Sequence, residues 1–114
     1  MPDAPISVFI SYSRTDTALV DKLEADLVAR NFRPWVDRRR LEGGQNWRDE
    51  IEKAISDCDV LVVLLTPDAV GSAYVRMEYR YALYKHKLVI PLLFRPCDIP
   101  IDLIDLQRYN IEGR

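Results

Sequence analysis

The sequence has few of the residues on which metal and nucleotide sites usually depend. Its 114 residues include two cysteines, one histidine and four glycines. The cysteines, Cys58 and Cys97, have no companion ligands at metal-binding spacing, so both are predicted to be free thiols and no metal is expected. Only Gly43 and Gly44 are neighbours, and neither a G-x-G-x-x-G pattern nor a P-loop can be drawn. The sequence therefore argues against a metal centre and a redox dinucleotide cofactor.

Long apolar runs and an excess of basic charge are also missing. No apolar stretch reaches the roughly 18 residues of a membrane span, and the N-terminus has no signal-peptide pattern. The 16 basic and 18 acidic residues give a net charge of −2, which argues against sequence-independent nucleic-acid binding. The composition predicts a cytoplasmic domain that binds neither membrane nor nucleic acid.

The longest apolar segment that is present runs from Asp59 to Thr66 and is rich in β-branched residues. It lacks polar alternation, so it predicts a strand covered on both faces, the usual position of a central strand in a parallel sheet. Four other segments predict strands: Ser7–Ser11, Phe32–Val36, Lys87–Phe94 and a short one near Arg108–Ile111.

Helical spacing of apolar residues separates these strands. Three helices are predicted. The first covers about Asp16–Arg30 with Thr15 or Asp16 as its cap, the second begins at Asn46, and the third covers Ala73–His86. Alternating strands and helices predict a single α/β domain, a flavodoxin-like, doubly wound sheet of five parallel strands in the order 2-1-3-4-5, with helices on both faces. Ligands of such sheets bind at the carboxyl ends of the strands beside the topological switch. Ser11–Arg14 and Thr66–Glu78 are therefore expected to face one crevice.

Three sequence motifs resemble those of bacterial-type Toll/interleukin-1 receptor (TIR) domains. They are Val8–Ser13, then Trp35–Asp37 with Leu41–Gly44, then Ser72–Glu78, and they span nearly the whole chain in the family's order. The resemblance implies a domain within a longer protein that has one of two activities. One is cleavage of NAD⁺ to nicotinamide and ADP-ribose or a cyclic isomer, and the other is non-catalytic self-association in signalling.

The resemblance also implies roles for individual residues. Glu78 falls on the catalytic glutamate of the family, and Tyr74 on an aromatic position that is commonly Trp. Tyr12 matches an aromatic residue on the nicotinamide side, and Arg14 lies in a stretch that is often basic. The expected substrate-binding residues are Ser11, Tyr12, Arg14, Asp37, Glu42, Ser72 and Tyr74.

The chemistry of this pattern is plausible without the resemblance. Nicotinamide leaves NAD⁺ as a neutral base, so a single carboxylate beside the positively charged ribose of the transition state can suffice. Tyr74 and Glu78 stand four residues apart and are expected to project together from one helix face. Structural alternatives stay open: Glu78 as a solvated helix residue, Tyr12 and Tyr74 as packing residues, and Asp37 as a turn residue.

The segment Asp37–Gln45 is expected to form an exposed loop. In the resembled family this loop contacts the next subunit, which implies self-association through residues such as Arg39, Leu41, Gly43 and Gly44. The leading hypothesis is an NAD⁺ nucleosidase that serves as the effector module of a bacterial defence or signalling protein, activated by oligomer or filament formation and linked to a sensor or oligomerisation domain. The alternative is a TIR interaction module without turnover.

Overall fold

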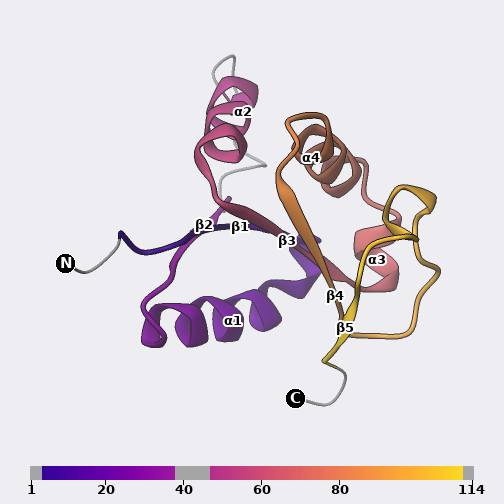
Figure 1. The fold of residues 1–114 in the computed structure, drawn as a ribbon. Coiled ribbons are helices and arrows are strands. Elements are labelled where there is room, and N and C mark those ends of the chain that lie inside the picture. The colour runs from indigo at the N-terminus through magenta and orange to yellow at the C-terminus, as the bar shows by residue number, and fades with distance from the viewer. Residues whose placement is uncertain (1–3, 38–46, 112–114) are drawn as a thin grey trace.

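The computed structural model describes residues 4–37 and 47–111 and shows one parallel sheet with strand order β2-β1-β3-β4-β5 (Figure 1). The strands are β1 (Ser7–Ser11), β2 (Arg33–Val36), β3 (Val60–Leu65), β4 (Leu88–Leu93) and β5 (Tyr109–Asn110). The helices are α1 (Thr17–Ala29), α2 (Trp47–Asp57), α3 (Pro67–Val70) and α4 (Ala73–Tyr84), with short 3-10 turns at Arg14–Asp16 and Ile101–Leu103. The predicted fold class and strand order are confirmed.

The central strand β3 is buried along its whole length and divides the core into two apolar clusters. Leu61, Val63 and Leu65 pack with side chains of α2, α3 and α4 on one face of the sheet. The alternating residues Val60, Val62 and Leu64 pack with α1 on the other. Successive side chains of a strand point to opposite faces, so an uninterrupted apolar run is what two covered faces require.

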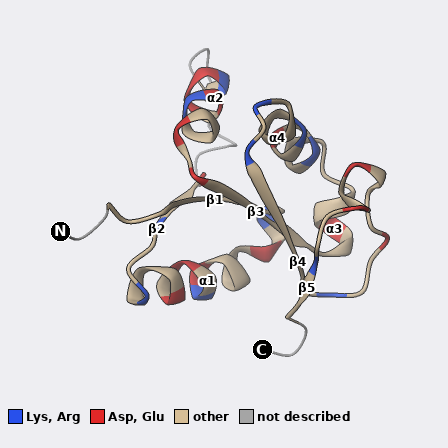
Figure 2. Ribbon diagram, in the orientation of Figure 1, with Lys and Arg blue, Asp and Glu red and all other residues tan. Residues whose placement is uncertain are grey.

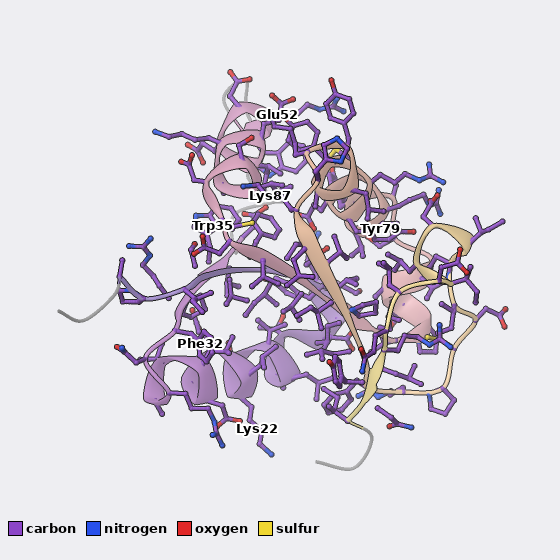
Figure 3. All side chains as sticks on the ribbon, viewed as in Figure 1. Lys22, Phe32, Trp35, Glu52, Tyr79 and Lys87 are labelled. Atoms are coloured by element: carbon purple, nitrogen blue, oxygen red, sulfur yellow. The ribbon has the colours of Figure 1, made fainter. Side chains whose placement is uncertain are left out.

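The surfaces of the helices carry most of the charge, whereas the strands carry little (Figure 2). Between the sheet and the helices the side chains form the packed interior seen in Figure 3. There Trp35 of β2 lies below α2. Its ring stacks on that of Phe9, with centroids 4.9 Å apart. Both cysteines are free thiols, and burial raises the pKa of the Cys58 thiol. No helix in the described parts of the chain is long and apolar enough to span a membrane.

Helix boundaries differ from the sequence prediction where the backbone turns into the left-handed region. The helix predicted to reach His86 ends at Tyr84, because His86 itself has a φ of 58°. Asn31, with a φ of 67°, similarly follows the end of α1. Residues in this conformation terminate helices, and asparagine tolerates it better than most residues.

The start of α1 departs from prediction for a different reason. Asp16 precedes the helix but makes no capping hydrogen bond with its side chain. Its carboxylate instead accepts hydrogen bonds from Thr66 Oγ1 at 2.6 Å and from Arg95 Nη1 at 3.2 Å, and the residue is buried. Asp16 thus occupies the predicted N-cap position, but its side chain does not cap the helix, since a buried carboxylate is more stable with a cation and a hydroxyl donor beside it. This network joins the carboxyl ends of β1, β3 and β4.

Candidate functional site

Ser11 and Glu78 meet at the carboxyl end of β1, although they are 67 positions apart in the sequence. Ser11 ends β1 and shares a face of the sheet with Phe9, the face that α2 and α4 cover. Its Oγ donates a hydrogen bond to Glu78 Oε1 at 2.8 Å, and Glu78 is 0% exposed. A carboxylate in the interior is costly to ionise unless polar partners stabilise it. Ser11 supplies one such partner and fixes the orientation of the carboxylate.

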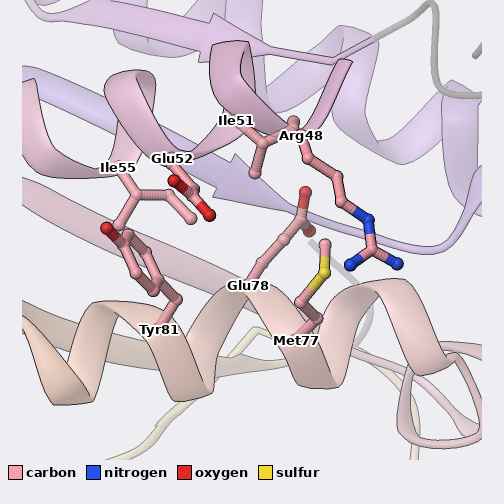
Figure 4. A pocket seen from close by; sticks show the side chains of 7 residues that line it. All are labelled: Arg48, Ile51, Glu52, Ile55, Met77, Glu78 and Tyr81. Carbon is pink, nitrogen blue, oxygen red and sulfur yellow. The ribbon is translucent and has the colours of Figure 1, made fainter. Parts of the chain in front are cut away.

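The carboxylate of Glu78 borders a cavity of about 170 Å³ between α2 and α4. Figure 4 shows Arg48 and Met77 on one side of this carboxylate and Glu52, Ile55 and Tyr81 on the other. The lining is mainly apolar but includes three charged side chains. The lining residues are Arg48, Ile51, Glu52, Ile55, Met77, Glu78 and Tyr81. Apolar surroundings strengthen the electrostatic effect of a fixed carboxylate, because little water screens it. Arg48, Glu52 and Tyr81 were not among the residues expected from the sequence.

Tyr12 lies on the opposite face of the sheet from Glu78. It follows Ser11, and its ring is 2% exposed among the apolar residues that pack with α1. Its hydroxyl donates a hydrogen bond to the backbone oxygen of Asp37 at 2.8 Å. The structure therefore gives Tyr12 a packing role that joins β1 to the end of β2.

Replacing Tyr12 by Phe is expected to lower the free energy of unfolding by about 1–2 kcal/mol, because the buried hydrogen bond to Asp37 is lost. Tyr84→Phe is the matched control, since Tyr84 is 75% exposed. Urea unfolding followed by circular dichroism measures both variants. Equal midpoints for the two would contradict a stabilising role of the Tyr12 hydroxyl.

Asp37 and Trp47 contact each other across the segment that separates β2 from α2. Trp47 Nε1 donates a hydrogen bond to Asp37 Oδ2 at 3.2 Å. The Trp47 ring also packs edge-on against Tyr74, with centroids 5.1 Å apart. These two contacts connect the first turns of α2 and α4 to the end of β2. Asp37 is buried, and its side chain is oriented by the indole.

A second, more open hollow of about 350 Å³ lies at the ends of β1 and α3. Its lining is rich in hydroxyl groups and includes one guanidinium and one ring: Ser13, Arg14, Thr15, Ser72 and Tyr74. Thr15 Oγ1 donates a hydrogen bond to Asp68 Oδ2 at 2.8 Å, which ties the turn after β1 to α3. Three of the expected substrate-binding residues, Arg14, Ser72 and Tyr74, thus line one hollow.

Tyr74 and Glu78 do not line the same space, although one helix face was expected to present both. Tyr74 is 44% exposed and lines the open hollow, whereas Glu78 is fully buried and borders the cavity between α2 and α4. Residues four apart on a helix differ by about 40° around its axis, which suffices to turn one toward the core and the other toward a neighbouring helix end. Glu42 and the proposed self-association residues Arg39, Leu41, Gly43 and Gly44 lie outside the described residues.

The described residues contain no group of three or more His, Cys, Asp or Glu side chains that could hold a metal ion. A buried carboxylate held by a serine can stabilise a positive charge that develops beside it. It can also act as a nucleophile and form a bond to the carbon that carries this charge. The open hollow presents Arg14 and hydroxyl groups, which suit phosphate and sugar groups.

The flavodoxin-like sheet and the carboxylate at its topological switch define a class of α/β domain with a crevice at the strand ends. The family model described as TIR domain matches residues 8–113. The chain belongs to the TIR domain family.

One curated protein is similar to this chain in sequence. The uncharacterized protein y4lF of Sinorhizobium fredii is 33% identical over 101 residues, which cover 81% of this chain and 31% of that protein. The chain thus spans about a third of the length of this curated relative.

Among solved structures, the TIR domain of the Toll-related receptor TRR-2 of Hydra magnipapillata matches with a TM-score of 0.80 and 23% identity over 91% of this chain and 82% of that one. The CMP N-glycosidase BcmB of Clostridium botulinum matches with a TM-score of 0.65 and 18% identity over 93% and 88% of the two chains. Both likenesses show the fold.

Proposed function

We propose that this TIR domain cleaves NAD⁺ at the bond between nicotinamide and ribose. The observation that carries the proposal is Glu78, a carboxylate with 0% exposure that borders a largely apolar cavity and accepts a hydrogen bond from Ser11 at 2.8 Å. A glutamate that only kept a helix soluble would point into water, whereas this one is held in the interior at the edge of a space that a ligand can enter.

The reaction needs little beyond this carboxylate. The bond between ribose C1′ and the pyridinium nitrogen breaks, and its electron pair goes to nitrogen, so nicotinamide leaves neutral without a general acid. Glu78 stabilises the positive charge on the ribose or forms a bond to C1′. Attack by water then gives ADP-ribose and releases one proton, while attack by a nitrogen or hydroxyl of the same molecule gives a cyclic isomer.

The fold is compatible with both candidate functions. One similar structure is named as a CMP N-glycosidase, so this α/β architecture can support cleavage of an N-glycosidic bond in a nucleotide. Another is the TIR domain of a Toll-related receptor, which keeps a purely signalling role as the alternative. The Ser11–Glu78 pair favours turnover, because an interaction module has no need of a buried, oriented carboxylate beside a cavity.

The biological setting is part of the same proposal. We place the domain in the cytoplasm, within a longer bacterial defence or signalling protein whose further domain senses a signal or drives assembly. It would use NAD⁺ as substrate and need no bound cofactor. Self-association through the segment 37–45 would activate it, by oligomer or filament formation.

Incubation of the purified protein with NAD⁺, followed by chromatographic separation, tests the proposal directly. Nicotinamide is expected to appear together with ADP-ribose or a cyclic isomer. If none forms at any protein concentration, including under crowding, the interaction module becomes the better description.

Ser11→Ala is expected to lower kcat by about tenfold or more with little change in KM, because one hydrogen bond that orients the charged Glu78 carboxylate is lost. Ser56→Ala is the matched control, since Ser56 lies on α2 but does not line the cavity. Initial rates over a range of NAD⁺ concentrations separate the two constants. An unchanged kcat in Ser11→Ala would show that Ser11 does not orient the carboxylate.

A further inference from the structure

Two threonine–aspartate pairs join the turn that follows β1 to the segment that follows β3. Thr66 Oγ1 donates a hydrogen bond to Asp16 Oδ2 at 2.6 Å, and Thr15 Oγ1 donates one to Asp68 Oδ2 at 2.8 Å. Each side of this contact therefore supplies one threonine and one aspartate. These four residues form the Thr–Asp clasp.

The inner half of the Thr–Asp clasp is buried, and its hydrogen bond has a fixed direction. Asp16 is 2% exposed and Thr66 is 0% exposed. Thr66 Oγ1 also accepts a hydrogen bond from the backbone nitrogen of Ala69 at 3.1 Å, so its own proton is directed to Asp16. The other carboxylate oxygen of Asp16 accepts a hydrogen bond from Arg95 Nη1 at 3.2 Å. Hydrogen bonds to a carboxylate are shorter and stronger than those between neutral groups.

A gain in stability does not account for the position of Asp16. The residue stands directly before α1, where its side chain could cap the helix, but it makes no capping hydrogen bond. Its carboxylate is instead buried and paired with Arg95, and an ion pair of a buried carboxylate adds little to stability once desolvation is counted. Buried polar contacts can instead select one arrangement of the segments that they join.

The Ser11–Glu78 hydrogen bond links the same two stretches of chain as the Thr–Asp clasp. One stretch, residues 11–16, runs from the end of β1 to the start of α1, and the other, residues 66–78, contains α3 and the first half of α4. Side-chain hydrogen bonds connect these stretches at three points, two in the clasp and one at the carboxylate of Glu78. Because both stretches are short, a change in their separation at the clasp also changes their separation at Glu78.

We propose that Asp16 and Thr66 are positioning residues for Glu78. The Thr–Asp clasp holds the end of β1 against α4, so that Ser11 stays within hydrogen-bonding distance of the carboxylate. The inference rests on the proposed function, because it assigns how the carboxylate of the same site is oriented. A misplacement of about 1 Å can cost about a hundredfold in rate, so a contact that never touches the substrate can still affect catalysis.

Thr66→Val is expected to lower kcat for NAD⁺ cleavage by about tenfold with little change in KM, the effect of losing one oriented hydrogen bond to a charged group. Valine keeps the shape of the side chain but donates no hydrogen bond to Asp16. Thr66→Ser retains the hydroxyl group and should restore most of the rate. Thr17→Val is the matched control, since the Thr17 hydroxyl donates to the backbone oxygen of Arg14 at 2.7 Å and does not reach residues 66–78.

A double variant distinguishes positioning of the carboxylate from a general loosening of the domain. If the clasp acts through Ser11, Thr66→Val should lower kcat by less than about twofold once Ser11→Ala has removed the hydrogen bond to Glu78. Independent effects would instead multiply to about a hundredfold. That multiplication, or an unchanged kcat in Thr66→Val alone, would overturn the assignment.

The carboxyl ¹³C signal of Glu78 gives a readout that needs no turnover. Glutamate labelled at the side-chain carboxyl makes the signal visible, and its absence in Glu78→Gln assigns it. Ser11→Ala should shift this signal, and Thr66→Val should shift it in the same direction, whereas Thr66→Ser and Thr17→Val should leave it near its wild-type position. A signal that moves in Ser11→Ala but not in Thr66→Val would refute the positioning role.

Asp16→Asn provides a second route if circular dichroism shows that Thr66→Val does not fold. Asparagine weakens the same hydrogen bond from the acceptor side and removes the charge that faces Arg95. It should therefore lower kcat and shift the Glu78 signal in the same direction as Ser11→Ala. A folded Asp16→Asn protein with neither change would also overturn the assignment.

The outcome is distinguishable from that of the proposed function. If wild type cleaves no NAD⁺ but the Glu78 signal responds to Thr66→Val, the activity is refuted and the control of the carboxylate by the clasp is supported. If NAD⁺ is cleaved and neither kcat nor the signal responds to Thr66→Val, the activity is supported and the positioning role is refuted.

Discussion

Glu78→Gln is expected to reduce nicotinamide release by at least about a hundredfold while the fold is retained. Glutamine keeps the size of the side chain and the oxygen that accepts the hydrogen bond from Ser11, so the buried contact survives. It removes the negative charge that opposes the positive ribose, and loss of one electrostatic stabiliser typically costs about 10²–10³ in rate. High-performance liquid chromatography of nicotinamide measures the rate, and circular dichroism with urea unfolding checks the fold.

Glu52→Gln gives a comparison within the same cavity. Both residues border it, but Glu52 is exposed, whereas Glu78 is fully buried beside Ser11. Substitution of Glu52 should therefore raise KM more than it lowers kcat. A Glu78→Gln protein as active as wild type would refute the catalytic assignment of Glu78.

Activity is also expected to rise steeply with protein concentration. The described site offers a cavity between α2 and α4 and an open hollow, and the open hollow leaves much of a bound dinucleotide exposed to water. A neighbouring copy that covers this hollow would bind the substrate from the other side and exclude water. Specific activity measured over a wide dilution series should fall as the assembly dissociates, whereas a self-contained site would keep it constant.

Mixing two inactive variants gives the sharper test of a shared site. Glu78→Ala removes the carboxylate but keeps the segment 37–45, and the double variant Leu41→Asp with Gly43→Pro alters that segment but keeps the carboxylate. If the segment of one copy completes the crevice of the next, the first variant supplies the segment and the second supplies the crevice. The mixture should then recover activity well above the sum of the separate proteins.

Co-assembly must be demonstrated independently, for example by light scattering or by pull-down of differently tagged copies. Each variant alone, at the same total protein concentration, provides the baseline. A mixture that assembles but stays inactive at every ratio would refute a site shared through this segment.

Much of the fold could be predicted from the sequence because it follows from local rules. The unbroken apolar run of β3 required cover on both faces, and alternation of strands and helices required a parallel sheet. The position of Ser11 and Glu78 in one crevice followed from this topology, since parallel strands present their carboxyl ends at one edge. Boundaries were less exact, as at His86, because a left-handed residue leaves little trace in a hydrophobic pattern.

The roles of several site residues were decided only by the tertiary structure. Tyr12 and Ser11 are neighbours in the sequence, yet the pleat of β1 sends one into the core beside α1 and the other to Glu78. Asp16 resembles a helix cap, but Arg95, 79 positions away, approaches its carboxylate and makes it part of a buried network. No local pattern contains such a distant partner.

The cavity beside Glu78 is the clearest product of tertiary packing. Its lining comes from α2 and α4, whose apolar and charged residues each follow ordinary amphipathic patterns. The sequence predicted both helices and placed Glu78 on one of them, whereas the structure shows that they cover the same face of the sheet. The space between them depends on how closely the helices approach and on the volumes of the facing side chains, Ile55 and Tyr81 among them. That distance is fixed by contacts across the whole domain, so only the folded structure could show that Glu78 borders a cavity of about 170 Å³.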